Sequence, residues 1–246
     1  LVVGDPDFNT PEFIKNAAKK ALDENFTHYT PVPGSKELRE ALTAYLFREY
    51  GVKAGTENVA VSTGGKQALF NVLMSIVDAG DEVIIPVPYW TSYPDMVALA
   101  GAVPVFAPSP ASRGFRITPE DLEKARTSRT RALILNSPSN PTGVTYDSDE
   151  MTALLDWAKR HEVFVIADEV YDQLVYPPAV RASACTWWKE NQEHVAIVNA
   201  LSKSFAMTGW RMGYTLGHAD LIRQCMKVQS QVTSNPCSIT QAAASA

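Results

Sequence analysis

The sequence predicts an α/β domain built around a largely parallel sheet. Short segments rich in β-branched residues alternate with longer segments of helical period, and this alternation is typical of such a sheet. The chain of 246 residues is 46% hydrophobic and 20% charged, which is enough to bury one sizeable core. It contains no internal repeat and no low-complexity linker.

The predicted elements alternate from residue 58 onwards. Seven segments are predicted as strands, at residues 59–61, 82–85, 103–106, 132–135, 163–167, 195–199 and 212–216. Four are predicted as helices, at residues 66–77, 92–100, 149–161 and 220–231. The third helix has acids in its first turn, and Ser148 precedes it as the expected N-cap.

The segment before residue 58 follows another pattern. An extended start over residues 4–11 leads into a helix to about residue 25, then a Pro/Gly turn at residues 31–34 and a helix to about residue 50. We expect this segment to wrap around the main domain, and most of its residues to serve packing and subunit contacts.

The bulk composition argues against several classes of partner. A net charge of −5 gives no basic field that would attract nucleic acid or an anionic membrane, so we expect small metabolites instead. No apolar stretch has the length of a spanning helix. Cys185, Cys225 and Cys237 fit neither a disulfide framework nor a CxxC metal pattern, which indicates reduced thiols in the cytoplasm.

Both ends of the sequence have the pattern of a truncated chain. It opens on Leu1, Val2 and Val3 without an initiator Met, and residues 241–246 resemble a helix cut partway through. We therefore expect that a targeting segment ahead of residue 1 would not be visible in this sequence.

A Gly-Gly turn joins the first predicted strand to a helix. In Ser62-Thr63-Gly64-Gly65-Lys66, the glycines let backbone amides approach an anion, and the helix N-terminus adds N–H groups and a favourable dipole. This pattern indicates a phosphate site. Taken alone, such a turn more often only connects a strand to a helix and binds no ligand.

A lysine and an arginine follow the sixth predicted strand. Lys203 lies among small residues, and Arg211 comes eight positions later. A lysine near apolar groups has a lowered pKa, so its neutral amine is competent to form a Schiff base. Arg211 can supply a fixed charge to a phosphate. The alternative is an exposed lysine with an unrelated arginine, the default for any single lysine.

Three further side chains follow strands at one predicted edge of the sheet. Asp168 comes directly after a buried strand, at the carboxyl end where open α/β sheets bind ligands. Trp90 follows another strand, and Asn140 lies in a proline-rich loop after a third. Together they would supply a carboxylate, a π-face and an amide.

Five motifs in this order resemble the class I aminotransferases, a family of fold-type I pyridoxal-phosphate enzymes. They are Gly-Gly-Lys-Gln, Pro-Tyr-Trp, Asn-Pro-Thr-Gly, Ala-Asp-Glu-Val-Tyr and Ser-Lys-Ser-Phe-Ala-Met-Thr-Gly-Trp-Arg. The resemblance covers essentially the whole chain. It implies a three-layer α/β/α large domain with a mostly parallel seven-stranded sheet over residues 31–246. Residues 1–30 would be an N-terminal segment that contributes to the substrate site and to dimer contacts.

The resemblance implies which residues hold the cofactor ring of pyridoxal 5'-phosphate. Lys203 would form the Schiff base and Asp168 would pair with the pyridinium nitrogen. Tyr171 and Asn140 would hydrogen-bond the phenolic oxygen, and Trp90 would stack on the ring.

The resemblance also implies a phosphate seat shared across a homodimer. The backbone amides of Gly65 and Lys66, which follow Gly64, would bind the phosphate together with Arg211. Tyr29 resembles the family tyrosine that reaches the phosphate of a neighbouring subunit.

The lysine motif departs from the family at one position. The family usually has Ser or Gly three residues before the lysine, whereas this chain has Ala200, so a hydroxyl contact to the phosphate is missing. Ser202 is a candidate to replace it, although its place directly before the lysine can turn its side chain elsewhere.

The implied reaction is ping-pong transfer of an amino group between an L-amino acid and a 2-oxo acid. Gly4 resembles the glycine whose backbone meets the substrate α-carboxylate, and Trp90 and Asn140 would also contact the substrate. Similarity to bacterial-type aspartate and prephenate aminotransferases implies that Lys66 meets the distal carboxylate of a dicarboxylic substrate. A lysine in the first helical turn is as often simply solvated.

Two other functions remain open at this stage. A pyridoxal-phosphate lyase or synthase of the same fold would share the cofactor-holding residues. A non-catalytic, aminotransferase-like effector domain of a regulator is the second alternative. The family's arginine for the α-carboxylate lies in a C-terminal small domain, for which we find no residues after Gln231, so we assign no arginine to that role and expect poor turnover.

Overall fold

A computed structural model describes residues 4–246, so the expected start at Leu1, Val2 and Val3 lies outside the described residues. The chain divides into two compact units. The first unit comprises the residues up to Asn71 together with Val198–Ala246, and the second unit comprises Val72–Ile197. The domain boundary expected after residue 30 stays a prediction.

Seven strands form a mostly parallel sheet in the order β1-β7-β6-β5-β4-β2-β3. β2 is parallel to both β3 and β4, β4 is parallel to β5, and β1 is antiparallel to β7. The predicted α/β fold class is confirmed, and every predicted strand matches a strand whose ends lie within two residues. The strands are β1 (Val59–Ser62), β2 (Glu82–Val87), β3 (Val103–Pro108), β4 (Thr130–Asn136), β5 (Phe164–Asp168), β6 (Val195–Ala200) and β7 (Gly213–Leu216).

The helices reproduce the predicted ones and add several short ones. Among residues 4–246, none is both long and apolar enough to cross a membrane. The three that the sequence did not reveal, α5, α7 and α8, have only four to seven residues, too few to display a helical period. The helices are α1 (Glu12–Asp23), α2 (Lys36–Tyr50), α3 (Gly65–Ile76), α4 (Ser92–Leu99), α5 (Pro119–Ala125), α6 (Ser148–Arg160), α7 (Cys185–Trp188), α8 (Leu201–Ser204), α9 (Ala219–Val232) and α10 (Ser238–Ala244).

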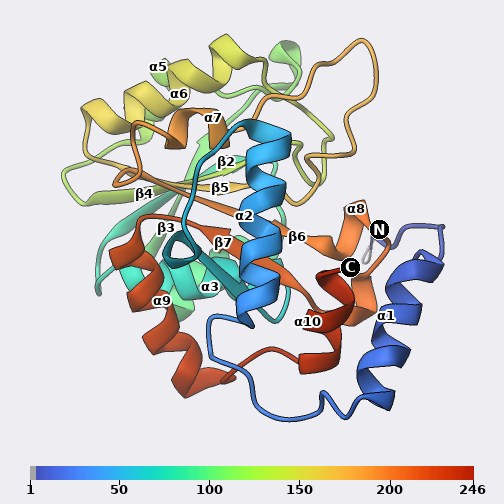
Figure 1. The fold of residues 1–246 in the computed structure, drawn as a ribbon. Helices are drawn as coiled ribbons and strands as arrows, with labels where there is room; N and C mark the ends of the chain where they lie inside the picture. The colour runs from blue at the N-terminus through green and yellow to red at the C-terminus, as the bar shows by residue number, and fades with distance from the viewer. Residues whose placement is uncertain (1–3) are drawn as a thin grey trace. The chain divides into compact units, whose positions relative to one another are not determined.

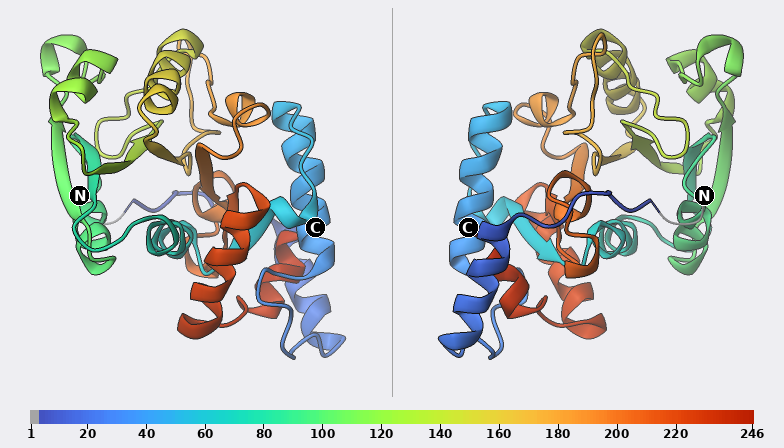
Figure 2. Two further views of the ribbon diagram at one scale, coloured as in Figure 1. Left: turned by 90° about the vertical axis from the view of Figure 1, so that its left-hand side faces the viewer. Right: turned by 90° about the vertical axis from the view of Figure 1, so that its right-hand side faces the viewer.

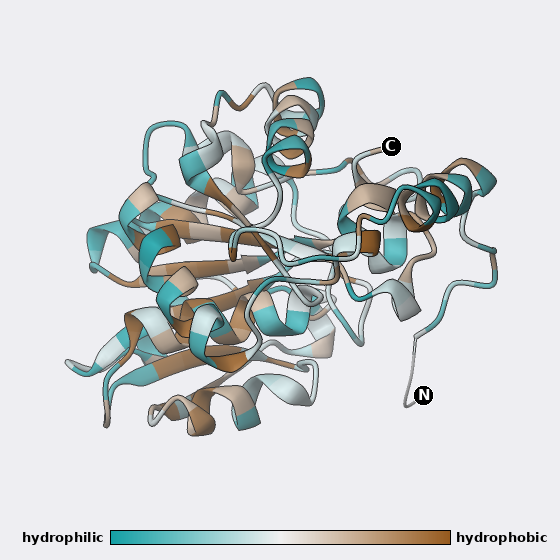
Figure 3. Cartoon of the chain, turned by 60° about the horizontal axis from the view of Figure 1, so that its bottom comes forward, coloured by the Kyte–Doolittle hydropathy of each residue, from teal (hydrophilic) through white to brown (hydrophobic). Residues whose placement is uncertain are grey.

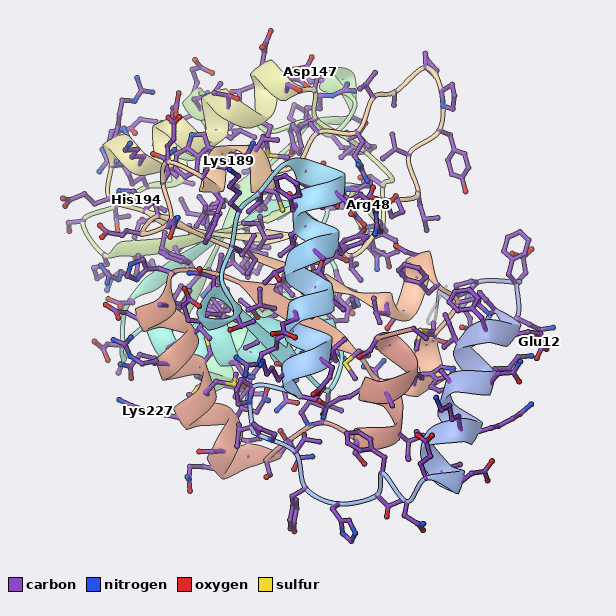
Figure 4. All side chains as sticks on the ribbon, in the orientation of Figure 1. Glu12, Arg48, Asp147, Lys189, His194 and Lys227 are labelled. Atoms are coloured by element: carbon purple, nitrogen blue, oxygen red, sulfur yellow. The ribbon has the colours of Figure 1, made fainter. Side chains whose placement is uncertain are left out.

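In the first unit, α1 and α10 pack side by side although they come from opposite ends of the chain (Figures 1 and 2). Ile14 and Ala18 of α1 form a buried apolar cluster with Ala243 of α10 and with Met207. Charged side chains of this unit, such as Glu12 and Lys227, point away from their helices (Figure 4). The cluster thereby ties the N-terminal segment to the region that follows Lys203.

Two buried glutamines fix the loop that joins α1 to α2. The side-chain amide of Gln229 donates to the backbone oxygens of Val32 and Val61, at 2.8 Å each. The side-chain oxygen of Gln241 accepts from the backbone N–H of Ser35 at 2.7 Å. Because these amides are shielded from water, each such bond is costly to lose, so the loop has a defined position at the end of β1.

In the second unit, the strands carry the core. The residues of β5 are buried from Val165 to Asp168, as are the first four residues of β2. Helices α4 and α5 pack on β3, and α6 packs on β5. Strands appear brown and the outer helical faces teal in the hydropathy view, which is the pattern of strands covered by amphipathic helices (Figure 3).

The predicted N-cap of α6 is wrong by one residue. Asp147, not Ser148, is the N-cap, and it lies at the start of α6 (Figure 4). Its side chain accepts from the backbone N–H of Glu150 at 2.8 Å, while the Glu150 side chain accepts from the N–H of Asp147 at 2.9 Å. This reciprocal capping box needs an acceptor three residues before the glutamate, which Asp147 supplies and Ser148 does not.

Candidate functional site

The first unit contains a glycine-lined seat at the start of α3. Gly64 has a left-handed φ of +84°, and a Cβ there would collide with the guanidinium of Arg211, whose Cζ lies 2.9 Å from that position. A Cβ on Gly213 would collide with the backbone nitrogen of Gly65. Only glycine fits these close approaches, so the fold brings the first N–H groups of α3 and a guanidinium to one place.

Arg211 is itself held in an unusual conformation. Its φ is 57°, in the left-handed region, and its Nη1 donates to the backbone oxygen of Thr208 at 2.9 Å. The Thr208 hydroxyl in turn donates to Asp5 at 2.6 Å. Arg211 remains exposed to solvent, so its charge is available to an anion at the seat.

Lys203 lies on α8, directly after β6, with its side chain half-buried. Its Nζ donates to the backbone oxygen of Gly4, so the structure joins two predicted site residues that are far apart in sequence. Burial lowers the pKa of the Lys203 ammonium, Asp5 opposes that shift, and Arg211 adds to it. A lowered pKa raises the share of neutral amine, which is the nucleophilic form.

The remaining predicted residues of the first unit differ in their exposure to solvent. Ser202 is buried at the start of α8 beside Ala200, whose Cβ lies 3.4 Å from where a Cβ on Gly65 would be. Lys66 is exposed in the first turn of α3. Tyr29 is 92% exposed in the loop after α1, so no part of the described chain covers its ring.

In the second unit, Asp168 ends β5 as a buried carboxyl group that is only 4% exposed. One oxygen accepts from the hydroxyl of Tyr93 at 2.6 Å, and the other accepts from the backbone N–H of Val170 at 3.3 Å. Burial raises the pKa of Asp168 to about 6, although both hydrogen bonds oppose that shift. The group therefore still ionises near neutral pH.

Asn136 organises this edge of the sheet, although no role was predicted for it from the sequence. It is paired in register with Asp168 across β4 and β5. Its side chain donates to the backbone oxygen of Asp168 at 2.9 Å and accepts from the backbone N–H of Asn140 at 2.8 Å. The signal available in the sequence was the end-of-strand position that it shares with Asp168.

The other predicted residues of the second unit form a chain of contacts with Asp168. Tyr171 is half-buried, and its hydroxyl lies 3.5 Å from the side-chain nitrogen of Asn140. Burial raises the pKa of Tyr171, the charge of Asp168 adds to the shift, and Asn140 opposes it. Trp90 packs edge-on against Tyr93, with ring centres 5.4 Å apart and planes at 89°. The structure thus brings together all four residues predicted here.

A second buried acid follows Asp168 directly. Glu169 is 1% exposed, and its carboxyl group accepts from the Ser183 hydroxyl at 2.5 Å and from the Ala184 N–H at 2.6 Å. Burial raises the pKa of Glu169 to about 8, against the effect of both donors. This acid fastens the chain that leads into α7 and was not among the predicted site residues.

Known proteins resemble this chain in sequence. The model of the family described as aminotransferase class I and II matches residues 1–246. An aspartate/prephenate aminotransferase of Cereibacter sphaeroides is 47% identical over 99% of this chain and 61% of the relative. An aspartate aminotransferase of Geobacillus stearothermophilus is 45% identical over 99% of this chain and 62% of the relative.

Solved structures resemble it in fold. The aspartate aminotransferase of Thermus thermophilus with maleate has a TM-score of 0.93 and 44% identity, covering 98% of this chain and 62% of that one. An aromatic aminotransferase of Pyrococcus horikoshii has a TM-score of 0.95 and 38% identity, covering 99% and 65%. The chain spans about three fifths of the length of these relatives. With a family model matched along its whole length and the family's motifs in order, the chain belongs to the class I and II aminotransferases.

Proposed function

We propose that this chain carries the cofactor-holding part of a pyridoxal 5'-phosphate-dependent aminotransferase, which moves an amino group between an L-amino acid and a 2-oxo acid. The observation that carries the proposal is Lys203, a half-buried amine with a lowered pKa in the same unit as an anion seat that only glycines permit. Membership of the aminotransferase family supports the same function.

The residues present fit this cofactor. The seat at Gly64 and Gly65 has the glycines and the cation that a phosphate monoester requires. Lys203 has an amine suited to an aldehyde, and Asp168 has a buried carboxyl group suited to a protonated ring nitrogen. Trp90, Tyr171 and Asn140 would contact the ring and its phenolic oxygen. Ser202 would add a contact to the phosphate, and Tyr29 would reach the phosphate of a neighbouring subunit.

The chemistry divides between the cofactor and the protein. When bound, pyridoxal phosphate supplies an aldehyde for the substrate amine and a ring that accepts electrons from the Cα–H bond. Nζ of Lys203 accepts the Cα proton as a general base and returns a proton as a general acid. Asp168 keeps the ring nitrogen protonated, and the backbone of Gly4 meets the substrate carboxylate.

A half-reaction with Lys203→Ala tests this function. The full chain is loaded with pyridoxal phosphate and mixed with aspartate, and the change in cofactor absorbance and the oxo-acid product are followed. Removing a general base is expected to slow the reaction by about a hundredfold or more. A rate like that of the parent would remove Lys203 from this role. Release of ammonia or a thiol, rather than an oxo acid, would favour the lyase alternative.

The substrate class that we propose is a dicarboxylic amino acid such as aspartate or glutamate. Lys66 is exposed in the first turn of α3 and would meet the distal carboxylate as a point charge. The relatives named as aspartate or aspartate/prephenate aminotransferases favour this class, and a Thermus relative was solved with the dicarboxylate maleate. An aromatic substrate is the second candidate, because a Pyrococcus aromatic aminotransferase has the same fold.

We also propose a cytoplasmic homodimer with shared active sites. The exposure of Tyr29 supports the shared site, because a side chain that reaches a neighbouring subunit must project from its own. Cys185, Cys225 and Cys237 form no disulfide among residues 4–246, which supports a reducing compartment. Light scattering on the purified chain would measure a doubled mass if the dimer forms.

A further inference from the structure

Tyr93 is a buried phenol that contacts the functional carboxyl group of the second unit. It lies in the first turn of α4, three residues after Trp90, and is only 2% exposed. Its hydroxyl donates to Asp168 over 2.6 Å, a length typical of a hydrogen bond to a charged acceptor. No sequence motif predicted a role for this tyrosine.

The protonation of Asp168 depends on few groups. Burial favours its neutral form, whereas Tyr93 and the N–H of Val170 favour the carboxylate. Within the described part of the second unit, charge interactions with Asp168 are seen for Tyr93, Tyr171 and Glu169, and none of these three is a cation. Tyr93 is therefore the principal side-chain donor that keeps Asp168 charged within the second unit.

Tyr93 remains a donor throughout the working pH range. Burial, and then the nearby charge of Asp168, raises the pKa of the Tyr93 phenol well above its ordinary value. The ring packs edge-on against Trp90, and the burial of Met96 and Val97 anchors the helix that carries it. The phenol thus presents a fixed O–H to one oxygen of Asp168 and leaves that group's remaining lone pairs for another partner.

We propose that Tyr93 is a positioning residue that keeps Asp168 ionised and oriented toward the ring nitrogen of the cofactor. This inference rests on the proposed function, in which Asp168 holds that nitrogen. One segment, residues 90–93, would then supply both the aromatic face for the ring and the donor for the acid that binds it.

Binding of pyridoxal phosphate to the cofactor-free full chain tests the proposal without any turnover. Tyr93→Phe removes only the hydroxyl oxygen. The dissociation constant of pyridoxal phosphate from this variant, measured by protein fluorescence, is expected to rise about ten- to a hundredfold, because a hydrogen bond to a charged group is lost. Tyr146→Phe is the matched control, because Tyr146 is also buried in the second unit and its hydroxyl bonds only a backbone N–H, that of Ile117, among the contacts described. It should bind within about twofold of the parent.

A double-mutant cycle separates this inference from the proposed function. Asp168→Asn should weaken cofactor binding, and Tyr93→Phe made in that background should add less than about a twofold effect, because Tyr93 acts through Asp168. If Asp168→Asn has no effect, the proposed function fails. If Asp168→Asn weakens binding and Tyr93→Phe does not, only the role of Tyr93 is overturned. An equal effect of Tyr93→Phe in both backgrounds would also overturn it, since a merely structural residue behaves that way.

A second pair of variants covers a failure of Tyr93→Phe to fold. Tyr93→Gln and Tyr93→Leu leave similar space, but only glutamine retains an N–H donor. We expect the glutamine variant to bind pyridoxal phosphate more tightly than the leucine variant. Equal binding by these two variants would contradict the proposal.

Discussion

The candidate functional groups of the two units lie in opposite environments. In the first unit, the groups are cations and backbone amides near solvent, and glycines at Gly64 and Gly213 allow their close approach. In the second unit, they are buried acids, Asp168 and Glu169, whose charge is set by burial and, against it, by two hydrogen bonds to each carboxyl group. The candidate site of the first unit therefore depends on backbone conformation. The charge of the acids in the second unit depends on how far water is excluded from their side chains.

The largest effect on cofactor binding is expected from Gly64→Ala in the first unit. The new methyl group would both strain a left-handed φ and displace Arg211, so we expect pyridoxal phosphate to bind about a hundredfold more weakly. The matched control is Gly80→Ala, where φ is +90° but no atom lies within 4 Å of the new Cβ. Equilibrium titration of both variants separates a change at the seat from general destabilisation by a strained φ, and equal losses would refute a role for the seat.

A change of pH should act on the second unit through Glu169. Its pKa in the folded chain is about 8, against an ordinary value of 4.5, so folding takes up a proton between these values. The stabilisation is complete below about pH 4.5 and is lost as the pH rises through 8. We expect the free energy of unfolding to fall by on the order of 4 kcal/mol over this window.

Glu169→Gln tests that expectation, because glutamine has a similar shape and no charge. Urea unfolding of this variant between pH 5 and pH 8 should show a flatter dependence than the parent. Glu150→Gln is the control, since Glu150 is a partly exposed acid of the same unit that caps α6. If the free energy of unfolding changed with pH equally in the parent and in Glu169→Gln, burial would not raise the pKa of Glu169.

The smallest effect is expected from Lys66→Ala, because an exposed charge is well screened by water. If Lys66 meets a distal carboxylate, kcat/KM for aspartate should fall about tenfold, while alanine and phenylalanine should be nearly unaffected. Lys36→Ala removes another exposed lysine of the first unit and serves as the control. An equal loss for all three substrates would remove substrate selection from the role of Lys66.

The sequence by itself determined the fold class and pointed to the candidate site residues. Strand and helix positions followed from hydrophobic period, since each element must bury one face. Lys203, Asp168 and Arg211 were identified because residue types suited to a Schiff base, a buried acid and a phosphate follow strands or glycine turns, and because their order matches a family. Local errors, such as Ser148 for Asp147, came from choosing between neighbouring residues of similar capping ability.

Only the tertiary structure revealed what surrounds those residues. The bonds from Lys203 to Gly4 and from Tyr93 to Asp168 join residues that lie 199 and 75 positions apart, and no local pattern encodes such pairs. The alignment of Asn136 with Asp168 depends on the register of two strands, which packing decides. The pKa of an acid likewise depends on how much water the fold excludes from it. The sequence thus named the candidate functional groups, and the fold decided their charge and their partners.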